Sequence, residues 1–172
     1  MFEKIFKHDP PLRDLIHTTM RRLQTQKGNL ELAATRLLNR DESLFETCAR
    51  IIKNGEGERA TIYAKEIAEV RKIIYIVTQS QLAIEQVILR LETLKEIGDI
   101  LQDLNPLLAT VHEIAKRLST VMPEVTLELH NMNSTIAETI NTTTLDSKSP
   151  ITPIEVNVKG VEEILQEVSA SA

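Results

Sequence analysis

Hydrophobic residues recur at steps of three and four along two long stretches of the chain, which is the spacing of one face of an α-helix. The first stretch covers residues 12–52 and follows Pro10–Pro11, which suit the first turn of a helix. Gly28 is its only interruption. The second stretch covers residues 62–104 and keeps the helical spacing through the β-branched segment 72–79. We therefore expect two long helices there, and no strand.

The segment between the two stretches, KNGEGE at residues 53–58, contains Asn and Gly residues that favour turns. A tight turn between two helices of similar length predicts a long antiparallel hairpin. A helix of about 40 residues is about 60 Å long. Such an elongated hairpin cannot bury its surface as a sphere would, so we expect exposed apolar stripes that neighbouring copies cover.

Two prolines mark the shorter elements that follow the hairpin. Asn105 and Pro106 are expected to end the second long helix, because proline lacks the backbone N–H and restricts the residue before it. Pro106 then starts a predicted helix over 106–121, and Pro123 starts another over 123–140.

The composition changes after about residue 143, where Ser, Thr and Pro become frequent and a linker is expected. Residues 161–168 carry a short amphipathic helical pattern. The expected organisation is an N-terminal segment (1–9), a helical core (10–143) and a flexible tail with a short terminal helix (144–172).

Composition indicates an all-α fold. Aromatic residues make up 3% of the 172 residues, and there are five glycines and no tryptophan. Leu, Ile, Val, Ala, Glu, Lys, Arg and Gln dominate, which is typical of long helices. No apolar run is long enough to span a bilayer and no signal peptide is evident, so we expect a cytoplasmic protein whose membrane contact is peripheral.

The net charge of −5 hides an uneven distribution. Residues 1–53 carry ten Lys/Arg against seven Asp/Glu, whereas residues 54–172 carry ten against eighteen. The basic first half suits an anionic membrane or the acidic half of the same or another chain. Nucleic acid is not expected as a partner, because the basic residues are scattered and base-stacking aromatics are nearly absent.

Residues that could carry chemistry are few and scattered. The four histidines are His8, His17, His112 and His130. None belongs to a Glu-x-x-His pair of the kind that di-metal helical bundles use. The single Cys48 is interpreted as a small core residue in a reducing compartment. Without a phosphate loop or a nucleophile motif, we expect no enzyme activity, no metal and no cofactor.

The order of these parts resembles a known family. A basic long hairpin is followed by proline-entered short helices, which include the stretch LNPLLATVHEIAKRLSTVMPEVTLELHNMNSTIAET at residues 104–139. Together with the acidic second half, this resembles archaeal ESCRT-III-like cell-division proteins of the CdvB group over about residues 1–145. Larger members append a winged-helix region, so the chain resembles a short paralogue without one.

The resemblance implies cytoplasmic subunits that polymerise with themselves and with other ESCRT-III-like subunits on the inner face of the membrane at the division site. There they would remodel or constrict the membrane, and an AAA-type ATPase would extract them. The family view also implies a hinge at Asn105 and Pro106, with Gly98 as a second soft point.

The N-terminal sequence MFEKIFK places Phe2, Ile5 and Phe6 on one face of a helical turn. Either the core of the hairpin or a foreign surface must cover that face. With the family in view we favour a membrane contact, in which Lys4 and Lys7 would attract anionic headgroups.

The tail sequence SPITPIEV presents an extended apolar strip suited to a groove between helices. Its residues are Pro150, Ile151, Pro153, Ile154 and Val156. The strip resembles the proline-based motifs by which this family engages the microtubule-interacting-and-trafficking domain of its ATPase, although it has fewer prolines. The helix at 161–168 is a competing docking element, and a plain linker is the other alternative.

The sequence is also consistent with a function of another class. The chain could be a soluble coiled-coil scaffold that forms a closed dimer and does not meet lipid. Filaments whose amount rises with concentration would separate the polymer from such a dimer.

Overall fold

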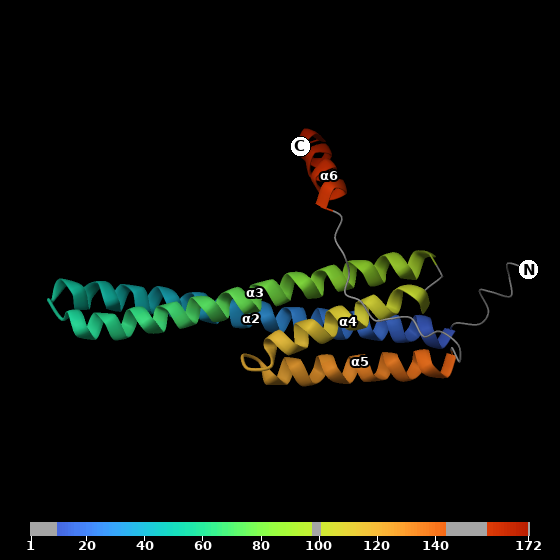
Figure 1. The fold of residues 1–172 in the computed structure, drawn as a ribbon, viewed down its shortest axis with the longest axis horizontal. Helices are drawn as coiled ribbons and strands as arrows, with labels where there is room; N and C mark the ends of the chain where they lie inside the picture. Colours follow the sequence, from blue (N-terminus) through green and yellow to red (C-terminus); the bar gives the residue numbers. More distant parts are fainter. Residues whose placement is uncertain (1–9, 98–100, 144–157, 172) are drawn as a thin grey trace, which may run out of the picture.

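The computed structural model describes residues 10–97, 101–143 and 158–171, and these residues form five helices without a strand (Figure 1). The helices are α2 (Pro10–Lys53), α3 (Gly57–Ile97), α4 (Leu101–Leu118), α5 (Pro123–Thr143) and α6 (Val158–Ser171). The all-α prediction is therefore confirmed, and segment 72–79 is helical as expected.

The two long helices form an antiparallel hairpin that gives the molecule its elongated shape (Figure 1). The turn lies where the sequence predicts it, between Lys53 and Gly57. Gly55 has a φ of 79°, a left-handed conformation that glycine adopts without steric cost. Its backbone N–H donates to the carbonyl of Ile52 at 3.0 Å, which satisfies one carbonyl of the last turn of α2.

Apolar side chains at seven-residue intervals hold the hairpin together. On α2 and α3 the buried residues of this series are Ile16, Leu23, Leu30, Leu44, Ile51, Val70, Val77, Ile84 and Leu91. A seven-residue spacing keeps one narrow face of each helix directed at the other over the whole length. The buried side chains form two clusters, and the half-buried Leu37 packs against both.

A second, shorter hairpin covers part of the first. α4 packs against α3 and α5 packs against α2, so four helices share one core at the end of the molecule where the long hairpin is open (Figure 1). The part of the long hairpin nearer its turn extends beyond α4 and α5 (Figure 1). There, the smaller cluster is formed by α2 and α3 alone.

Polar contacts fix the short hairpin in place. Asn133 Nδ2 donates to the carbonyl of Leu108 at 2.9 Å and ties α5 to α4. The guanidinium of Arg22 on α2 meets the carboxylate of Glu128 on α5 at 2.6 Å. Both side chains of this ion pair are about one-third exposed. We therefore expect the pair to favour the position of α5 against α2 and to add little to the free energy of folding.

The predicted boundary between the second and third helices is wrong. α3 ends at Ile97 instead of Leu104, and α4 begins at Leu101 and continues through Pro106. The side chains of Leu104, Leu107 and Leu108 are buried in the four-helix core. Packing of this apolar face outweighs the local cost of a proline inside the helix.

The C-terminal helix α6 is longer than the predicted 161–168 and contacts none of the other described helices. None of the described helices combines the length and the apolar character that a bilayer-spanning helix needs.

Substitution by alanine should have opposite effects on stability at the two glycines, one inside α2 and one in the turn that follows it. Gly28→Ala should stabilise the protein by about 0.5–1 kcal/mol, because Gly28 lies inside α2 and an added Cβ would meet nothing within 4 Å. Gly55→Ala should destabilise it by about 1 kcal/mol, because alanine resists the positive φ. Urea denaturation measures both, and effects of the same sign would contradict this account of the turn.

Candidate assembly surfaces

Most of the residues that the sequence singles out for binding lie outside the described residues. This applies to the proposed membrane-contact residues Phe2, Lys4, Ile5, Phe6 and Lys7. It applies equally to the tail residues Pro150, Ile151, Pro153, Ile154 and Val156, and to Gly98. Their roles therefore stay predictions.

The remaining predicted hinge residues, Asn105 and Pro106, lie inside α4 and are half-buried. The carbonyl of Pro106 accepts a hydrogen bond from Thr110 Oγ1 at 3.0 Å, one turn further along the helix. The two residues are thus part of a packed helix and do not form the boundary that the sequence predicts. A hinge at this position stays a prediction.

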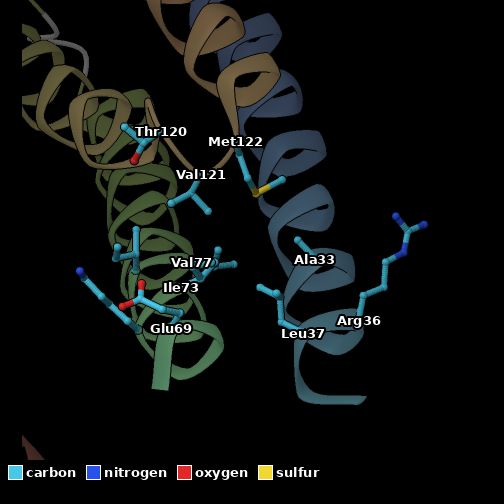
Figure 2. Close-up of a pocket in the computed structure, with 11 residues that line it drawn as sticks. Ala33, Arg36, Leu37, Glu69, Ile73, Val77, Thr120, Val121 and Met122 are labelled. Atoms are coloured by element: carbon cyan, nitrogen blue, oxygen red, sulfur yellow. The ribbon is translucent and has the colours of Figure 1, made fainter. Parts of the chain in front are cut away.

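A groove of about 540 Å³ lies where the long hairpin emerges from under the α4–α5 turn (Figure 2). Its apolar wall comes from both long helices and from the turn. The wall residues are Ala33, Leu37, Ile73, Ile76, Val77, Val121 and Met122. Several of them are only half-buried, so this groove is a place where apolar surface remains available.

Charged side chains border the groove. Arg36 extends outward from α2, while Glu69 lies on the α3 side (Figure 2). Arg36 and Arg40 are exposed and make no ion pair among the described residues. This edge of α2 therefore carries positive charge that an acidic partner could neutralise.

A different edge of the hairpin is neutralised internally. Arg71 Nε donates to Asp41 Oδ1 at 2.8 Å, and this hydrogen bond, together with the negative charge of Asp41, raises the pKa of Arg71. The Arg71 guanidinium also lies 6.0 Å from the ring centre of Phe45. An exposed aromatic ring, a cation and a carboxylate thus meet across α2 and α3.

α6 carries an apolar face that no described helix covers. Val161, Ile164, Leu165 and Val168 recur at helical spacing and are all exposed. The intervening positions hold Glu162, Glu163 and Glu167. α6 is therefore an acidic amphipathic helix available for binding.

The structure brings two of the four histidines together. The rings of His112 on α4 and His130 on α5 lie 5.8 Å apart between centroids. Within the described residues there is no group of three or more His, Cys, Asp or Glu side chains that could hold a metal ion. Cys48 is buried in the smaller cluster, where its Sγ donates to the carbonyl of Ala60 at 3.5 Å. It is a core residue, as predicted.

Two exposed apolar stripes follow the long helices, and sequence reasoning did not single out their residues. The α2 stripe consists of Leu38, Phe45 and Ile52, and the α3 stripe consists of Tyr75, Leu82 and Leu89. Each side chain is more than half exposed. These residues could have been found in the sequence, because on each helix they form a second series of apolar residues at seven-residue spacing, separate from the buried series.

Comparison with known proteins identifies the family to which this chain belongs. Over 137 residues the chain is 35% identical to cell division protein B1 of Sulfolobus acidocaldarius, and over 115 residues it is 37% identical to cell division protein B of the same organism. These matches cover 80% and 67% of the chain. The chain belongs to the CdvB family of ESCRT-III-like proteins.

The chain spans 64% of the length of the first of these CdvB relatives and 44% of the second. No family model and no solved structure matches it. The long helical hairpin with shorter helices beside it fits the all-α ESCRT-III-like fold expected of a CdvB protein.

Proline substitutions test where the helices of this CdvB protein begin. Pro106→Ala should stabilise the protein by about 2 kcal/mol, because it restores a donor inside α4. Pro123→Ala should not stabilise it, because Pro123 is the first residue of α5, where proline costs little and restricts the unfolded chain. Thermal and urea denaturation measure both. Destabilisation by Pro106→Ala would show that a helix starts at Pro106 after all.

Proposed function

We propose that this CdvB protein is a self-polymerising subunit that remodels membrane during cell division and that an AAA-type ATPase disassembles. The names of the two relatives support the cell-division role. The observation that carries self-assembly is the uncovered apolar surface of a rod-shaped hairpin, which includes both stripes and the groove. Large apolar side chains that stay exposed along one line of a helix, together with an apolar groove, are candidate binding surfaces.

Assembly is expected to include other ESCRT-III-like subunits as well as copies of the same chain. The rod shape supports this part of the proposal, because a hairpin exposed along its length can contact neighbours on several sides. The α2 edge with Arg36 and Arg40 and the acidic α6 offer opposite charges for contacts between copies.

The proposed membrane contact rests on the sequence of residues 1–9. Burial of Phe2, Ile5 and Phe6 in lipid would contribute at most roughly 2 kcal/mol each, and ordering the segment would consume much of that gain. One copy should therefore bind weakly. Many copies in one polymer would bind through avidity, with Lys4 and Lys7 adding attraction to anionic headgroups. The contact lies at the inner face of the membrane at the division site.

The proposed ATPase contact lies in the tail. Two neighbouring elements of the tail could bind in a groove between helices of the receptor. One is the strip from Pro150 to Val156, and the other is the exposed apolar face of α6. The uncovered state of α6 among the described helices supports a role in binding another protein. The expected receptor is the microtubule-interacting-and-trafficking domain of an AAA-type ATPase.

A closed coiled-coil dimer without membrane contact is the second candidate. The seven-residue spacing on α2 and α3 favours it, because the same spacing occurs in coiled coils that stop at two chains. Light scattering separates the two candidates. A mass that stays at two chains as concentration rises indicates the dimer, whereas mass that grows with concentration indicates the polymer.

Vesicle binding tests the membrane part of the proposal. In electron microscopy and co-sedimentation, the wild-type chain should form filaments on anionic vesicles and few on neutral ones. The double variant Phe2→Ala, Phe6→Ala should bind anionic vesicles at least about tenfold more weakly, because each truncation removes buried apolar area. Its melting temperature and its assembly without lipid should stay unchanged. Normal vesicle binding with a much lower melting temperature would return both rings to the protein core.

A titration tests the ATPase part. A peptide of residues 144–172 should bind the isolated microtubule-interacting-and-trafficking domain of the ATPase, and substituting Asp for Ile164 and Leu165 should weaken that binding if α6 carries it. The alternative variant, with Ala in place of Pro150 and Pro153, reports on the proline strip. Absence of binding by the wild-type peptide would exclude the tail as the docking element.

A further inference from the structure

The α2 stripe and the α3 stripe have matching geometry. Each consists of three large apolar side chains at seven-residue intervals and is therefore about 21 Å long. Neither stripe belongs to the groove or to the buried clusters, so α4, α5 and the hairpin core leave both uncovered. A partner that fits one stripe must present large apolar side chains at the same seven-residue spacing. The other stripe of a second copy has that property.

Resting on the self-assembly proposed above, we infer that the α2 stripe of one copy packs against the α3 stripe of the next copy. With the two helices parallel and Phe45 opposite Tyr75, Ile52 comes opposite Leu82. The small Ala68 comes opposite Leu38 and leaves room for it. In this register two pairs of large side chains face each other, as at the core positions of a parallel coiled coil, and Leu89 lies beyond Lys53, the last residue of α2.

Charge selects the same register. Glu42 lies beside the α2 stripe, between Leu38 and Phe45 in sequence, and Lys72 lies three residues before Tyr75, between the α3 stripe and the groove that it also lines. Both are exposed, and neither has an ion-pair partner among the described residues. When Phe45 faces Tyr75, Glu42 faces Lys72. The two free charges thus neutralise each other only when the stripes of two copies meet.

The chemistry of the α2 stripe disfavours an anionic membrane as its occupant. Glu42 and Glu46 flank Phe45, and both are exposed. Arg71, which lies beside the Phe45 ring, is already held by Asp41 at 2.8 Å. Carboxylates around an apolar stripe repel acidic headgroups, whereas the basic side chain on the α3 stripe attracts them.

One junction of this kind is weak. The six side chains of the two stripes are each more than half exposed and offer at most roughly 600 Å² of apolar surface, which is below the roughly 1,200 Å² of a stable interface. The contact is also heterologous, since each copy uses its α2 stripe for one neighbour and its α3 stripe for the other. Such contacts repeat without closing, so the expected product is an open chain that forms above a threshold concentration.

Charge exchange tests the pairing. Glu42→Lys alone sets lysine against Lys72 of the next copy, and Lys72→Glu alone sets glutamate against Glu42. Each variant should raise the threshold concentration for pelletable assembly at least about tenfold at low salt. An equimolar mixture of the two variants should restore the wild-type threshold, because unlike charges then meet at every junction between unlike chains. The double variant carrying both changes should assemble alone.

Matched controls separate this pairing from general surface effects. Leu32→Ser and Leu127→Ser remove exposed leucines that lie outside both stripes, and they should leave the threshold unchanged. Phe45→Ser and Tyr75→Ser should raise it at least about tenfold. Circular dichroism melting of every variant checks that these exposed substitutions leave the fold intact.

The outcomes distinguish this inference from the proposed function. If the wild type assembles and the mixture of the single charge variants does not recover, the α2-to-α3 pairing is overturned while self-assembly stands. If the charge variants assemble normally but lose vesicle binding, lipid is the occupant and the pairing is again overturned. If the wild type forms no assembly at any concentration, with or without vesicles, both the pairing and the proposed polymer are overturned.

Discussion

The structure depends on apolar side chains repeated every seven residues along two helices that are too long to fold around a compact core. The repeat gives α2 and α3 a continuous line of mutual contact from Ile16 to Ile51 and from Val70 to Leu91. Because the line is narrow, the rest of each helix surface stays open. The direct result is an elongated rod (Figure 1) whose flanks carry exposed side chains.

The short hairpin of α4 and α5 covers the long hairpin along only part of its length. It buries one flank beside the open end of the long hairpin, and it ends at the groove below Val121 and Met122. Beyond that point the smaller cluster, which includes Leu44 and Cys48, is closed by α2 and α3 alone. The stability of this outer part therefore depends on two helices, and the α2 stripe that it carries remains available to a second molecule.

Each long helix thus carries two series of apolar residues at seven-residue spacing, one on its buried face and one on an exposed face. The buried series holds the monomer, and the exposed series supplies the contacts that we propose between copies. α3 shows this double use most clearly, because Val77 and Ile84 are fully buried while Tyr75 and Leu82 on the same turns are more than half exposed. A helix that is apolar on two sides needs a partner on each.

Much of the fold could be predicted from the sequence, because periodicity and turn residues act locally. The hairpin, its turn at Gly55 and the start of α5 at Pro123 follow from such signals. The start of α4 did not, since the burial of Leu104 and Leu107 depends on helices distant in sequence and overrides the local effect of Pro106. Exposed apolar stripes were expected, but the residues that form them were not identified, because a helical repeat shows its spacing without showing which of its faces another helix covers.

Cysteine cross-linking of assembled protein tests the central claim most directly. Phe45→Cys in one population and Tyr75→Cys in another place thiols on facing stripes of neighbouring copies, while the native Cys48 stays buried; the protein concentration is kept above the raised assembly threshold of these variants. Mild oxidation of the mixed assembly should yield disulfide-linked dimers that neither variant yields alone. Equal cross-linking in the single-variant samples, or none in the mixed assembly, would contradict the pairing of the α2 stripe with the α3 stripe.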